Sequence, residues 1–273
     1  MEIKKVWAVY FTGTLTTKTV VERLAERLSD KFACSREVYD FSLPEAREKA
    51  MEFEKGDLVV FGTPVIAGRV PNLLLKYLQT IKGDGAVGVP VVLYGNRNYD
   101  DALIELRDIL EAGGIRTVAA GAFIGEHSFS ETLGAGRPDE KDLNKVDSFA
   151  DMIHSKVRDG EAFEMIEVEG VPSPYRGYYM PRDRKGNHRD IRKVKPVTDL
   201  SKCNGCGICA EVCTMGSIDP QDYSKVPGIC IKCCACVKRC PEKAKYYEDE
   251  GYLYHQHELE EQWVRRAEPE IFI

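Results

Sequence analysis

The sequence predicts an α/β protein in two parts: a doubly wound sheet of five parallel strands, followed by a small α+β domain. Two observations support this prediction. Apolar segments rich in β-branched residues alternate with helical patterns over residues 1–158. Nine of the ten cysteines then fall between positions 203 and 240. The chain of 273 residues, 43% hydrophobic and 30% charged, suits one or two globular domains with their own cores.

The expected strands and helices alternate along the first part of the chain. Buried parallel strands are continuous apolar runs, because helices cover both faces of such a sheet. Crossover helices place the carboxyl ends of all strands at one edge, and ligands of these sheets bind beyond that edge. The expected strands are 6–11, 38–41, 58–62, 89–94 and 117–124, and the expected helices are 19–31, 44–53, 71–81, 100–112 and 137–157.

A hydroxyl-rich loop, YFTGTLTTKT at residues 10–19, follows the first expected strand and opens a helix. Backbone N–H groups at a helix start, together with threonine hydroxyls, form a nest that can hold a phosphate without a lysine. The G-x4-G-K-[ST] motif is absent, so we do not expect triphosphate chemistry. A cluster of threonines that only caps the helix is the alternative. The hydroxyls come from Thr12, Thr14, Thr16 and Thr17.

Two glycine-containing loops follow the third and fourth expected strands. They are FGTPVIAGRVP at residues 61–71 and YGNRNYDD at residues 94–101. Such turns let backbone groups approach the edge of a planar ring, and Tyr99 is placed to cover a ring face. One loop for a phosphate and two for a ring indicate a mononucleotide. The G-x-G-x-x-G match at 83–88 precedes a strand, so we expect a turn there and no dinucleotide site.

The cysteines form a repeat. The spacing C-x2-C-x2-C-x3-C occurs twice, 27 residues apart, with Pro241 after the second run. This is the spacing of bacterial ferredoxins with two 4Fe-4S clusters, in which the fourth cysteine of each run binds the other cluster. That rule predicts one cluster on Cys203, Cys206, Cys209 and Cys240, and a second on Cys230, Cys233, Cys236 and Cys213.

Structural zinc is the alternative for these cysteines, but zinc sites usually pair two short C-x2-C hooks around a longer spacer. Cys234 fits neither register, and we expect it to be a small packed residue or a neighbour of a ligand. Thr214 stands where proline usually follows the fourth cysteine, and the ligand spacing is unaffected. Cys34, far from the others in the sequence, is expected to pack in the core.

Together, the threonine loop, GTPVIAGRVP from Gly62, YGNRNYDDAL from Tyr94 and GRPDEKDL from Gly136 make nearly the whole chain resemble flavodoxin-ferredoxin fusion proteins of anaerobes. The resemblance implies a flavodoxin-like FMN domain at 1–158 and a two-cluster ferredoxin domain at 199–250. Leu15 stands where many flavodoxins have glycine, and Ile66 where an aromatic commonly stacks on the flavin, which implies looser or shallower flavin binding. The implied FMN contacts are Thr12, Gly13, Thr14, Leu15, Thr16 and Thr17 at the phosphate, and Pro64, Val65, Ile66, Ala67, Gly68, Gly95, Asn96, Arg97, Asn98 and Tyr99 at the ring.

Between the two expected domains lies a connection at 159–198, and a helix and tail at 251–273 follow them. The connection has eight Lys or Arg against two Asp over residues 176–195, a formal charge of +6. A nucleic-acid arm would look similar, but we favour a linker that lies against the acidic protein or docks an acidic redox partner. In the tail we expect a helix at 255–267, and then an extended end that pins the small domain to the large one.

His127 follows the fifth expected strand, at the edge where a flavin would bind. We consider a role for it in hydrogen bonding to a reduced flavin or protonating it, with an ordinary loop histidine as the alternative. No activated nucleophile or recognisable carboxylate pair occurs in the sequence.

Two 4Fe-4S clusters and FMN together predict an electron-transfer protein. A 4Fe-4S cluster exchanges one electron, while a flavin takes one or two. The alternatives are a flavin-dependent reductase fed by the clusters, and a ferredoxin unit with a flavin-free docking module. Redox proteins are the expected partners, and a homodimer is left open. The net charge of −6 gives no reason to expect nucleic acid. The chain has no run approaching ~18 apolar residues, and the start MEIKKVWAVYF shows no cleavage site, so we expect a cytoplasmic protein.

Overall fold

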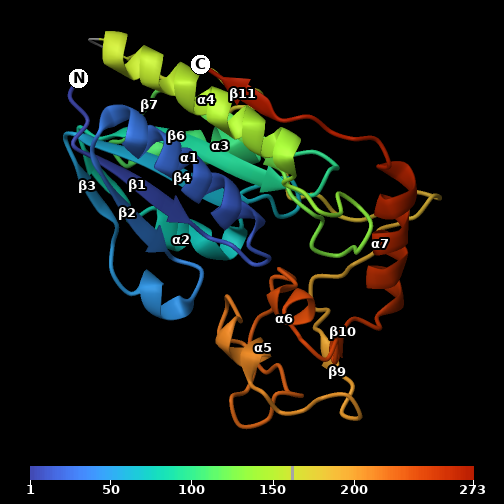
Figure 1. The fold of residues 1–273 in the computed structure, drawn as a ribbon. Coiled ribbons are helices and arrows are strands. Elements are labelled where there is room, and N and C mark those ends of the chain that lie inside the picture. Colours follow the sequence, from blue (N-terminus) through green and yellow to red (C-terminus); the bar gives the residue numbers. More distant parts are fainter. Residues whose placement is uncertain (161–162) are drawn as a thin grey trace.

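The structure is a computed structural model that describes residues 1–160 and 163–273. Its centre is a sheet in the order β2-β1-β4-β6-β8, with all five strands parallel (Figure 1). This is the flavodoxin-like order of a doubly wound sheet, and it confirms the predicted fold class. The strands are β1 Lys5–Tyr10, β2 Ser35–Asp40, β4 Asp57–Pro64, β6 Val87–Tyr94 and β8 Ala120–Ile124.

The sheet is wider than the sequence predicted. The expected strand at 117–124 is divided into β7, Arg116–Thr117, and β8, and both pair with β6. At the far edge, β11, Glu270–Phe272, runs antiparallel to β8. The extended end of the chain therefore completes the sheet of the large domain and covers the backbone edge of β8.

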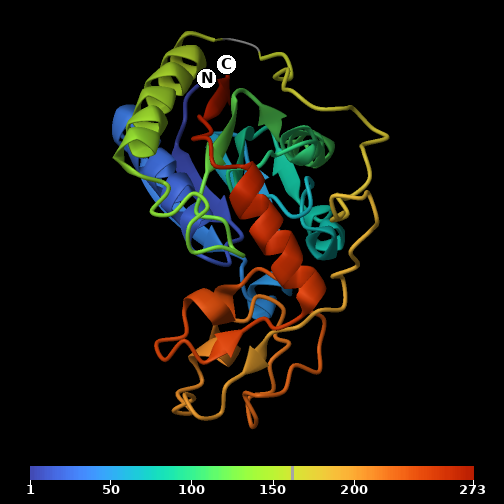
Figure 2. The same ribbon diagram turned by 90° about the vertical axis from the view of Figure 1, so that its right-hand side faces the viewer.

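Helices cover both faces of the sheet (Figures 1 and 2). On one face, α1 and α4 bury apolar side chains against Val6, Ala8 and Tyr10 of β1. On the other, α2 and α3 pack over Val9, Phe11 and neighbouring side chains. A capping box between Asp139 and Asp142 starts α4. The helices are α1 Thr16–Phe32, α2 Leu75–Leu78, α3 Ala102–Ala112 and α4 Glu140–Asp159.

The predicted helix at 44–53 is wrong. Residues Pro44–Arg47 form a short 3-10 helix, η1, and Glu52–Glu54 form strand β3, which pairs with β5, Lys82–Asp84. Phe53 is buried in β3 and packs edge-on against Trp7, 5.5 Å between ring centroids. The alternation of exposed, buried and exposed side chains over three residues is too short to be distinguished from a helix turn in the sequence.

The predicted helix at 71–81 is also shorter than expected. It consists of a 3-10 turn, η2 Asn72–Leu74, followed by α2. Gly85 takes a φ of 78° at the turn between β5 and β6, where the sequence predicted a turn instead of a dinucleotide loop. No helix within the described residues is long and apolar enough to cross a membrane.

The C-terminal part from 197 to 249, called here the cysteine-rich domain, lies beyond the carboxyl ends of the strands (Figure 1). From it, α7 runs back toward the sheet and leads into β11; it begins five residues earlier than predicted and ends at Gln262. The connection after α4 runs along the side of the sheet that carries α2 and α3 (Figure 2). The elements are β9 Val197–Thr198, α5 Ile208–Glu211, α6 Ala235–Lys238, β10 Lys245–Tyr246 and α7 Glu250–Gln262.

Candidate functional site

The threonine loop joins β1 to α1 at the carboxyl edge of the sheet. Leu15 is the N-cap residue, in a left-handed conformation with a φ of 71°, and no side chain caps the helix. The threonine side chains therefore do not cap the N-terminus of α1, in contrast to the alternative considered from the sequence. The side-chain hydroxyl of Thr12, which is 5% exposed, has no hydrogen-bond partner among the described residues, and neither has that of Thr63 at the end of β4. Buried hydroxyls without partners are uncommon, and a bound anion or water would satisfy them.

The structure brings the three predicted loops to the same edge. Val65 donates its backbone N–H to the carbonyl of Leu93 (2.8 Å), which ties the second loop to the strand before the third. A Cβ added at Gly125 would lie 2.7 Å from Cβ of Thr16, so the loop after β8 packs directly on the threonine loop. Gly95 packs in the same way against the side chain of His127. These close approaches place the loops after β1, β4, β6 and β8 around one region.

Tyr99 does not have the role that the sequence predicted. It is buried, its ring packs against Tyr94 at 5.6 Å between centroids, and its hydroxyl donates to Glu270 of β11 (2.6 Å). Burial, followed by the hydrogen bond to Glu270, raises the pKa of Tyr99. Its ring faces the core and is not available to cover a ligand.

Tyr179, which the sequence analysis did not single out, lies against the two ring loops instead. Its backbone N–H donates to the carbonyl of Ala67 (2.8 Å), and its ring centroid is 4.5 Å from the guanidinium carbon of Arg97. The side chain is 40% exposed. It therefore bridges the loop after β4 and the loop after β6 from outside. The only signal in the sequence was the density of aromatic residues in YRGYYMP.

Several contacts hold this part of the connection in place. Arg176 forms an ion pair with Asp101 at the start of α3, and the hydroxyl of Tyr178 donates to the carbonyl of Val70 (2.8 Å). Arg69 pairs with Glu105 at 2.6 Å and stacks on Tyr178. Of the basic residues in the connection, Arg176 pairs with an acid of the large domain, and Arg184 pairs with Glu258 of α7. Arg189 and Arg192 pair with Asp183 and Asp190 within the connection itself.

The side chain of Asn96 is fully used by the chain's own tail. Its Nδ2 donates to the carbonyls of Trp263 (2.7 Å) and Arg265 (2.6 Å), and its Oδ1 accepts from the N–H of Ala267 (3.0 Å). Asn96 has a φ of 65°, which asparagine tolerates better than most residues. The backbone carbonyl of Asn96 also accepts from Nη1 of Arg265 (2.8 Å), so the backbone N–H is the group that remains for a ligand.

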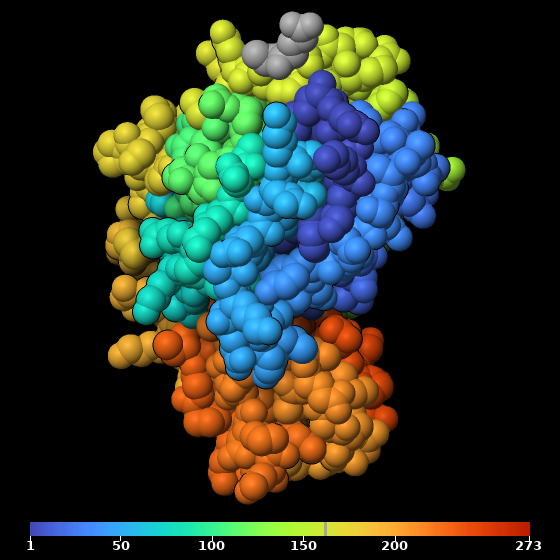
Figure 3. Space-filling view, turned by 90° about the vertical axis from the view of Figure 1, so that its left-hand side faces the viewer, coloured from blue at the N-terminus to red at the C-terminus, as the bar shows by residue number. Residues whose placement is uncertain are grey.

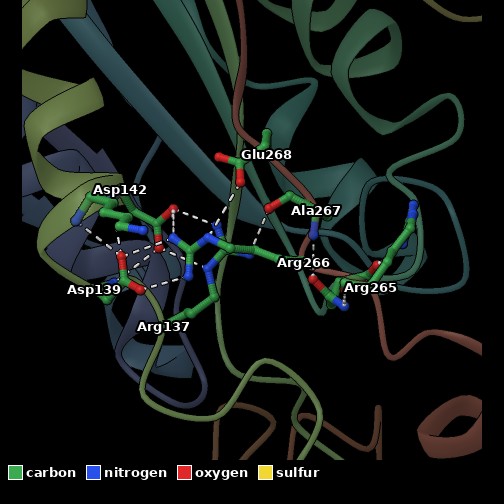
Figure 4. A network of polar contacts seen from close by, with 9 residues as sticks. Arg137, Asp139, Asp142, Arg265, Arg266, Ala267 and Glu268 are labelled. Atoms are coloured by element: carbon green, nitrogen blue, oxygen red, sulfur yellow. Dashed lines mark hydrogen bonds and ion pairs between the residues drawn. The ribbon is translucent and has the colours of Figure 1, made fainter.

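Arg137, within the GRPDEKDL segment, also binds the tail (Figure 4). It pairs with Asp142 inside the protein and donates to the carbonyl of Ala267 (2.7 Å). Arg266 pairs with Asp139 at 2.7 Å and with Asp142 at 3.4 Å. The hydrogen bond from Arg266 lowers the pKa of Asp139, although burial opposes it. This segment, one of those that carried the resemblance, therefore anchors the tail and starts α4.

His127 is neutral in this setting. Burial lowers its pKa to about 3, and the nearby positive groups of His255, Arg97 and Lys238 add to the effect. Its Nδ1 accepts the backbone N–H of Phe129 (3.1 Å), so Nε2 carries the ring hydrogen. The imidazole can donate a hydrogen bond, but at neutral pH it is not an imidazolium acid. The proton-donor part of the predicted role is not supported by this environment.

In the cysteine-rich domain, four of the cysteines line one cavity. The cavity also contacts Tyr223 and Lys245. Its thiols come from the first run and, for the fourth, from the end of the second run, so the chain crosses over as the spacing rule expects. They surround a space, and no group of three or more His, Cys, Asp or Glu among the described residues is arranged to hold a single metal ion. The four are Cys203, Cys206, Cys209 and Cys240.

The other four predicted ligands, Cys213, Cys230, Cys233 and Cys236, include the buried Cys236 and approach the large domain at Cys233. Burial raises the pKa of the Cys233 thiol, and the neighbouring Cys230 and Cys213 raise it further. Cys213 belongs to the first run, so this group is also crossed. Backbone N–H groups point at sulfur atoms in both groups: Ser217 to Cys213 (3.2 Å), Lys232 to Cys230 (3.4 Å) and Ala244 to Cys240 (3.2 Å).

Cys234 lies in a separate small core. It is 2% exposed and packs with Ile191, Tyr247 and Tyr252. Its Sγ lies 3.4 Å from the carbonyl of Lys232 and 3.5 Å from the hydroxyl of Tyr252. Cys34 likewise packs at the edge of the core formed by α1 and α4. Both placements agree with the packing roles expected for these two cysteines.

The threonine loop and this second cysteine group touch. A Cβ added at Gly13 would lie 2.9 Å from both Cβ and the carbonyl oxygen of Cys233. Ile231 is part of the same core as Phe11 and Phe41, so the cysteine-rich domain shares apolar packing with the sheet. Figure 3 shows the blue segment that contains η1 resting directly on the orange cysteine-rich domain.

Comparison with known proteins agrees with this architecture. Residues 196–219 match the family model of the 4Fe-4S binding domain, which includes the first cysteine run and not the second. No relative was found among curated proteins. The chain thus combines an α/β sheet of flavodoxin-like order with a 4Fe-4S binding domain.

Three solved structures are similar to the large domain, each at 16% identity and each matching 56% of this chain. They are a flavodoxin from the domain Archaea (99% of that chain, TM-score 0.40), a Streptococcus pneumonia TIGR4 flavodoxin (99%, 0.39) and the apo form of NADH:FMN oxidoreductase (EMOB) (89%, 0.38).

Proposed function

We propose that this protein transfers electrons between FMN at the carboxyl edge of the sheet and two 4Fe-4S clusters in the cysteine-rich domain. The observation that carries the proposal is the contact between Gly13 and Cys233. It joins the loop suited to a flavin phosphate to a cysteine suited to bind iron. Because these two residues touch, the two proposed sites would adjoin at this point.

The two clusters would have different places in the route. The cysteine group on Cys213, Cys230, Cys233 and Cys236 lies next to the threonine loop. The other group, on Cys203, Cys206, Cys209 and Cys240, includes the exposed Cys206. An outside redox protein would therefore exchange electrons with the second of these groups, and the first would pass them to or from the flavin.

The flavin would supply the ability to take one or two electrons, while each cluster takes one. The chain's own residues bind and position the cofactors. Thr12 and the N–H groups at the start of α1 would hold the phosphate, and the backbone at 64–68 and 95–99 would contact the ring. Tyr179 would cover the ring site, and hydrogen bonds to the cysteine sulfurs would tune the clusters.

Two observations favour an electron carrier over a reductase of small molecules. His127 is neutral, so the nearest candidate acid has no proton to give at neutral pH as an imidazolium. Tyr179 and the tail residues that bind Asn96 lie against the loops where a small substrate would have to approach. The reductase remains the second candidate, supported by the partial exposure of His127.

Anaerobic purification followed by joint measurement of iron, sulfide and FMN tests the proposal. The expected result is about eight irons and one FMN per chain. About eight irons without flavin would contradict the FMN site and leave a ferredoxin with a docking module. About four irons would contradict the second cluster.

Single cysteine replacements test the ligand sets. Cys206→Ser and Cys233→Ser should each reduce the iron content by about half, with loss of a different cluster signal in electron paramagnetic resonance. Cys234→Ser is the matched control, because Cys234 neighbours Cys233 but packs in the small apolar core. Loss of a cluster in the control would show that the ligand register is wrong.

A further inference from the structure

Thr214 directly follows Cys213, at the position where two-cluster ferredoxins usually have proline. Its side chain is 1% exposed. Its hydroxyl lies 3.3 Å from Sγ of Cys233. When Cys233 binds iron as a thiolate, only the threonine can donate in this pair. Proline at this position would offer no donor.

Arg47, from η1 of the large domain, holds Thr214 in place. Its Nη2 donates to the carbonyl of Thr214 (2.7 Å), and its Nη1 donates to the carbonyls of Phe41 and Ser42 (2.8 Å each). Its guanidinium also stands over the ring of Phe11, 5.8 Å from the centroid. Arg47 and Thr214 are 167 residues apart in the chain.

The charge of Arg47 is not neutralised by an ion pair. Its described hydrogen-bond acceptors are all backbone carbonyls, and no described carboxylate lies within 4.0 Å of it. Arginine keeps its proton at neutral pH even when partly buried. A positive charge therefore lies beside the residue that contacts Cys233.

The same contacts extend to the threonine loop. The backbone N–H of Thr12 donates to Oγ of Ser42 (2.8 Å), and the carbonyl of Ser42 accepts from Arg47. A continuous set of hydrogen bonds thus runs from Thr12 through Ser42, Arg47 and Thr214 to Cys233. We call these five residues the interdomain clamp.

We propose that the interdomain clamp makes the cluster on Cys233 easier to reduce than it would be without these contacts, and holds it against the flavin loop. This inference rests on the proposed ligand sets. Reduction adds one electron, and hence one negative charge, to the cluster, with the electron coming from the redox partner or the flavin. A hydrogen bond to sulfur and a nearby positive charge both stabilise that added charge. The cluster on Cys206 has Lys245 and the N–H of Ala244 as its own neighbours. It does not contact the clamp, so changes in the clamp should leave its potential unaffected.

The test compares Thr214→Val with Thr214→Ser in the full-length protein. Valine keeps the shape and loses the hydroxyl, whereas serine keeps the hydroxyl. The potential of each cluster is measured in a redox titration followed by electron paramagnetic resonance. For Thr214→Val we expect the ratio of reduced to oxidised Cys233 cluster at a fixed potential to fall about fivefold, where tenfold corresponds to 59 mV. Thr214→Ser should be close to wild type, and the other cluster unchanged.

Arg47→Gln provides a second, independent variant. It keeps an amide that can reach carbonyl groups but removes the charge, so it should also lower the reduced fraction of the Cys233 cluster alone, and Arg47→Lys should restore part of it. Arg116→Gln is the matched control for loss of a charge, because Arg116 is exposed at the opposite end of the sheet. Its cluster potentials should not change.

Equal shifts of both clusters, or no shift in Thr214→Val and Arg47→Gln, would overturn the inference. Iron and FMN contents are measured on the same samples. A chain with eight irons and no flavin would contradict the proposed function, while the hydrogen bond to Cys233 would still be tested by the potentials. A chain with FMN and eight irons but unshifted potentials would contradict the clamp and leave the proposed function intact.

Discussion

Gly13 and Cys233 lie so close that no side chain fits between them: a Cβ on Gly13 would be 2.9 Å from Cβ of Cys233. Gly13 does not have a positive φ. Glycine is therefore needed at this position because a side chain would clash, and not because of the backbone conformation. The contact fixes how closely the cysteine-rich domain approaches the carboxyl edge of the sheet.

Gly13→Ala should therefore separate the two parts. Overpacking of a tight contact costs about 1 to 3 kcal/mol, and here the neighbour includes backbone, which cannot rotate away. We expect a loss of stability of this size, measured by urea unfolding, and slower electron exchange between flavin and clusters, measured by rapid-mixing absorbance. Gly177→Ala is the control, since nothing lies within 4 Å of a Cβ at that position. Equal behaviour of the two variants would refute the contact.

Tyr179→Ala should weaken FMN binding about fivefold, because a ring contact contributes about 1 kcal/mol beyond its buried area. Tyr179→Phe should bind as the wild type does, since the ring and the backbone N–H to Ala67 remain. The dissociation constant is measured by flavin fluorescence. Tyr246→Ala, which removes a similarly exposed tyrosine from β10, should have no effect. An unchanged affinity in Tyr179→Ala would exclude this residue from the flavin site.

Asn96→Ala should release the tail. It removes three hydrogen bonds and leaves the carbonyls of Trp263 and Arg265 and the N–H of Ala267 without their partner. At about 1 kcal/mol for each bond, the free energy of unfolding should fall by about 2 to 4 kcal/mol. Hydrogen exchange should rise in β11. Asn144→Ala, at an exposed position of α4, is the control and should leave both measurements unchanged. If Asn96→Ala also changes neither stability nor hydrogen exchange, β11 alone holds the tail.

The buried His255 and the partly buried His127 should make stability depend on pH. Burial lowers the pKa of His127 to about 3 and that of His255 to about 4. Below the unfolded pKa of about 6.5 the unfolded chain binds protons that the folded chain does not, so stability is full above pH 6.5 and falls as the pH drops toward 4. Each histidine contributes a slope of up to about 1.4 kcal/mol per pH unit.

Urea unfolding at several pH values between 7.5 and 5.5 measures this slope. His255→Gln should reduce it by about half, because one of the two histidines with a lowered pKa is removed. His257→Gln is the control on the same helix, where the side chain is exposed. A wild-type stability that does not change between pH 7.5 and 5.5 would show that neither histidine is held neutral.

Several features could be predicted from local sequence because they depend on local patterns. Buried parallel strands must be apolar along their whole length, so β1, β4, β6 and β8 were visible. The edge strand β2, whose side chains are mostly exposed, overlaps the expected strand at 38–41 only in part. The cysteine spacing is set by the loops that wrap a cluster, and the structure places Cys240 among the thiols of the first run as that spacing implies. The prediction failed for short segments. In residues 44–53, buried and exposed side chains alternate over too few positions to distinguish a strand from a helix. The packing of Phe53 on Trp7 and the pairing of β3 with β5 make this segment a strand at 52–54.

By itself, the sequence determined the fold class. It also predicted the edge at which ligands would bind and the two crossed sets of cysteine ligands, because each prediction follows from residue types at fixed spacing. Only the tertiary structure decided which distant residues meet. Tyr99 turned inward to Glu270, while Tyr179 came from the connection to cover the ring loops. Arg47 reached Thr214 across 167 residues. Spacing describes the surroundings of one segment, whereas these contacts depend on how separate segments pack, which no local pattern records.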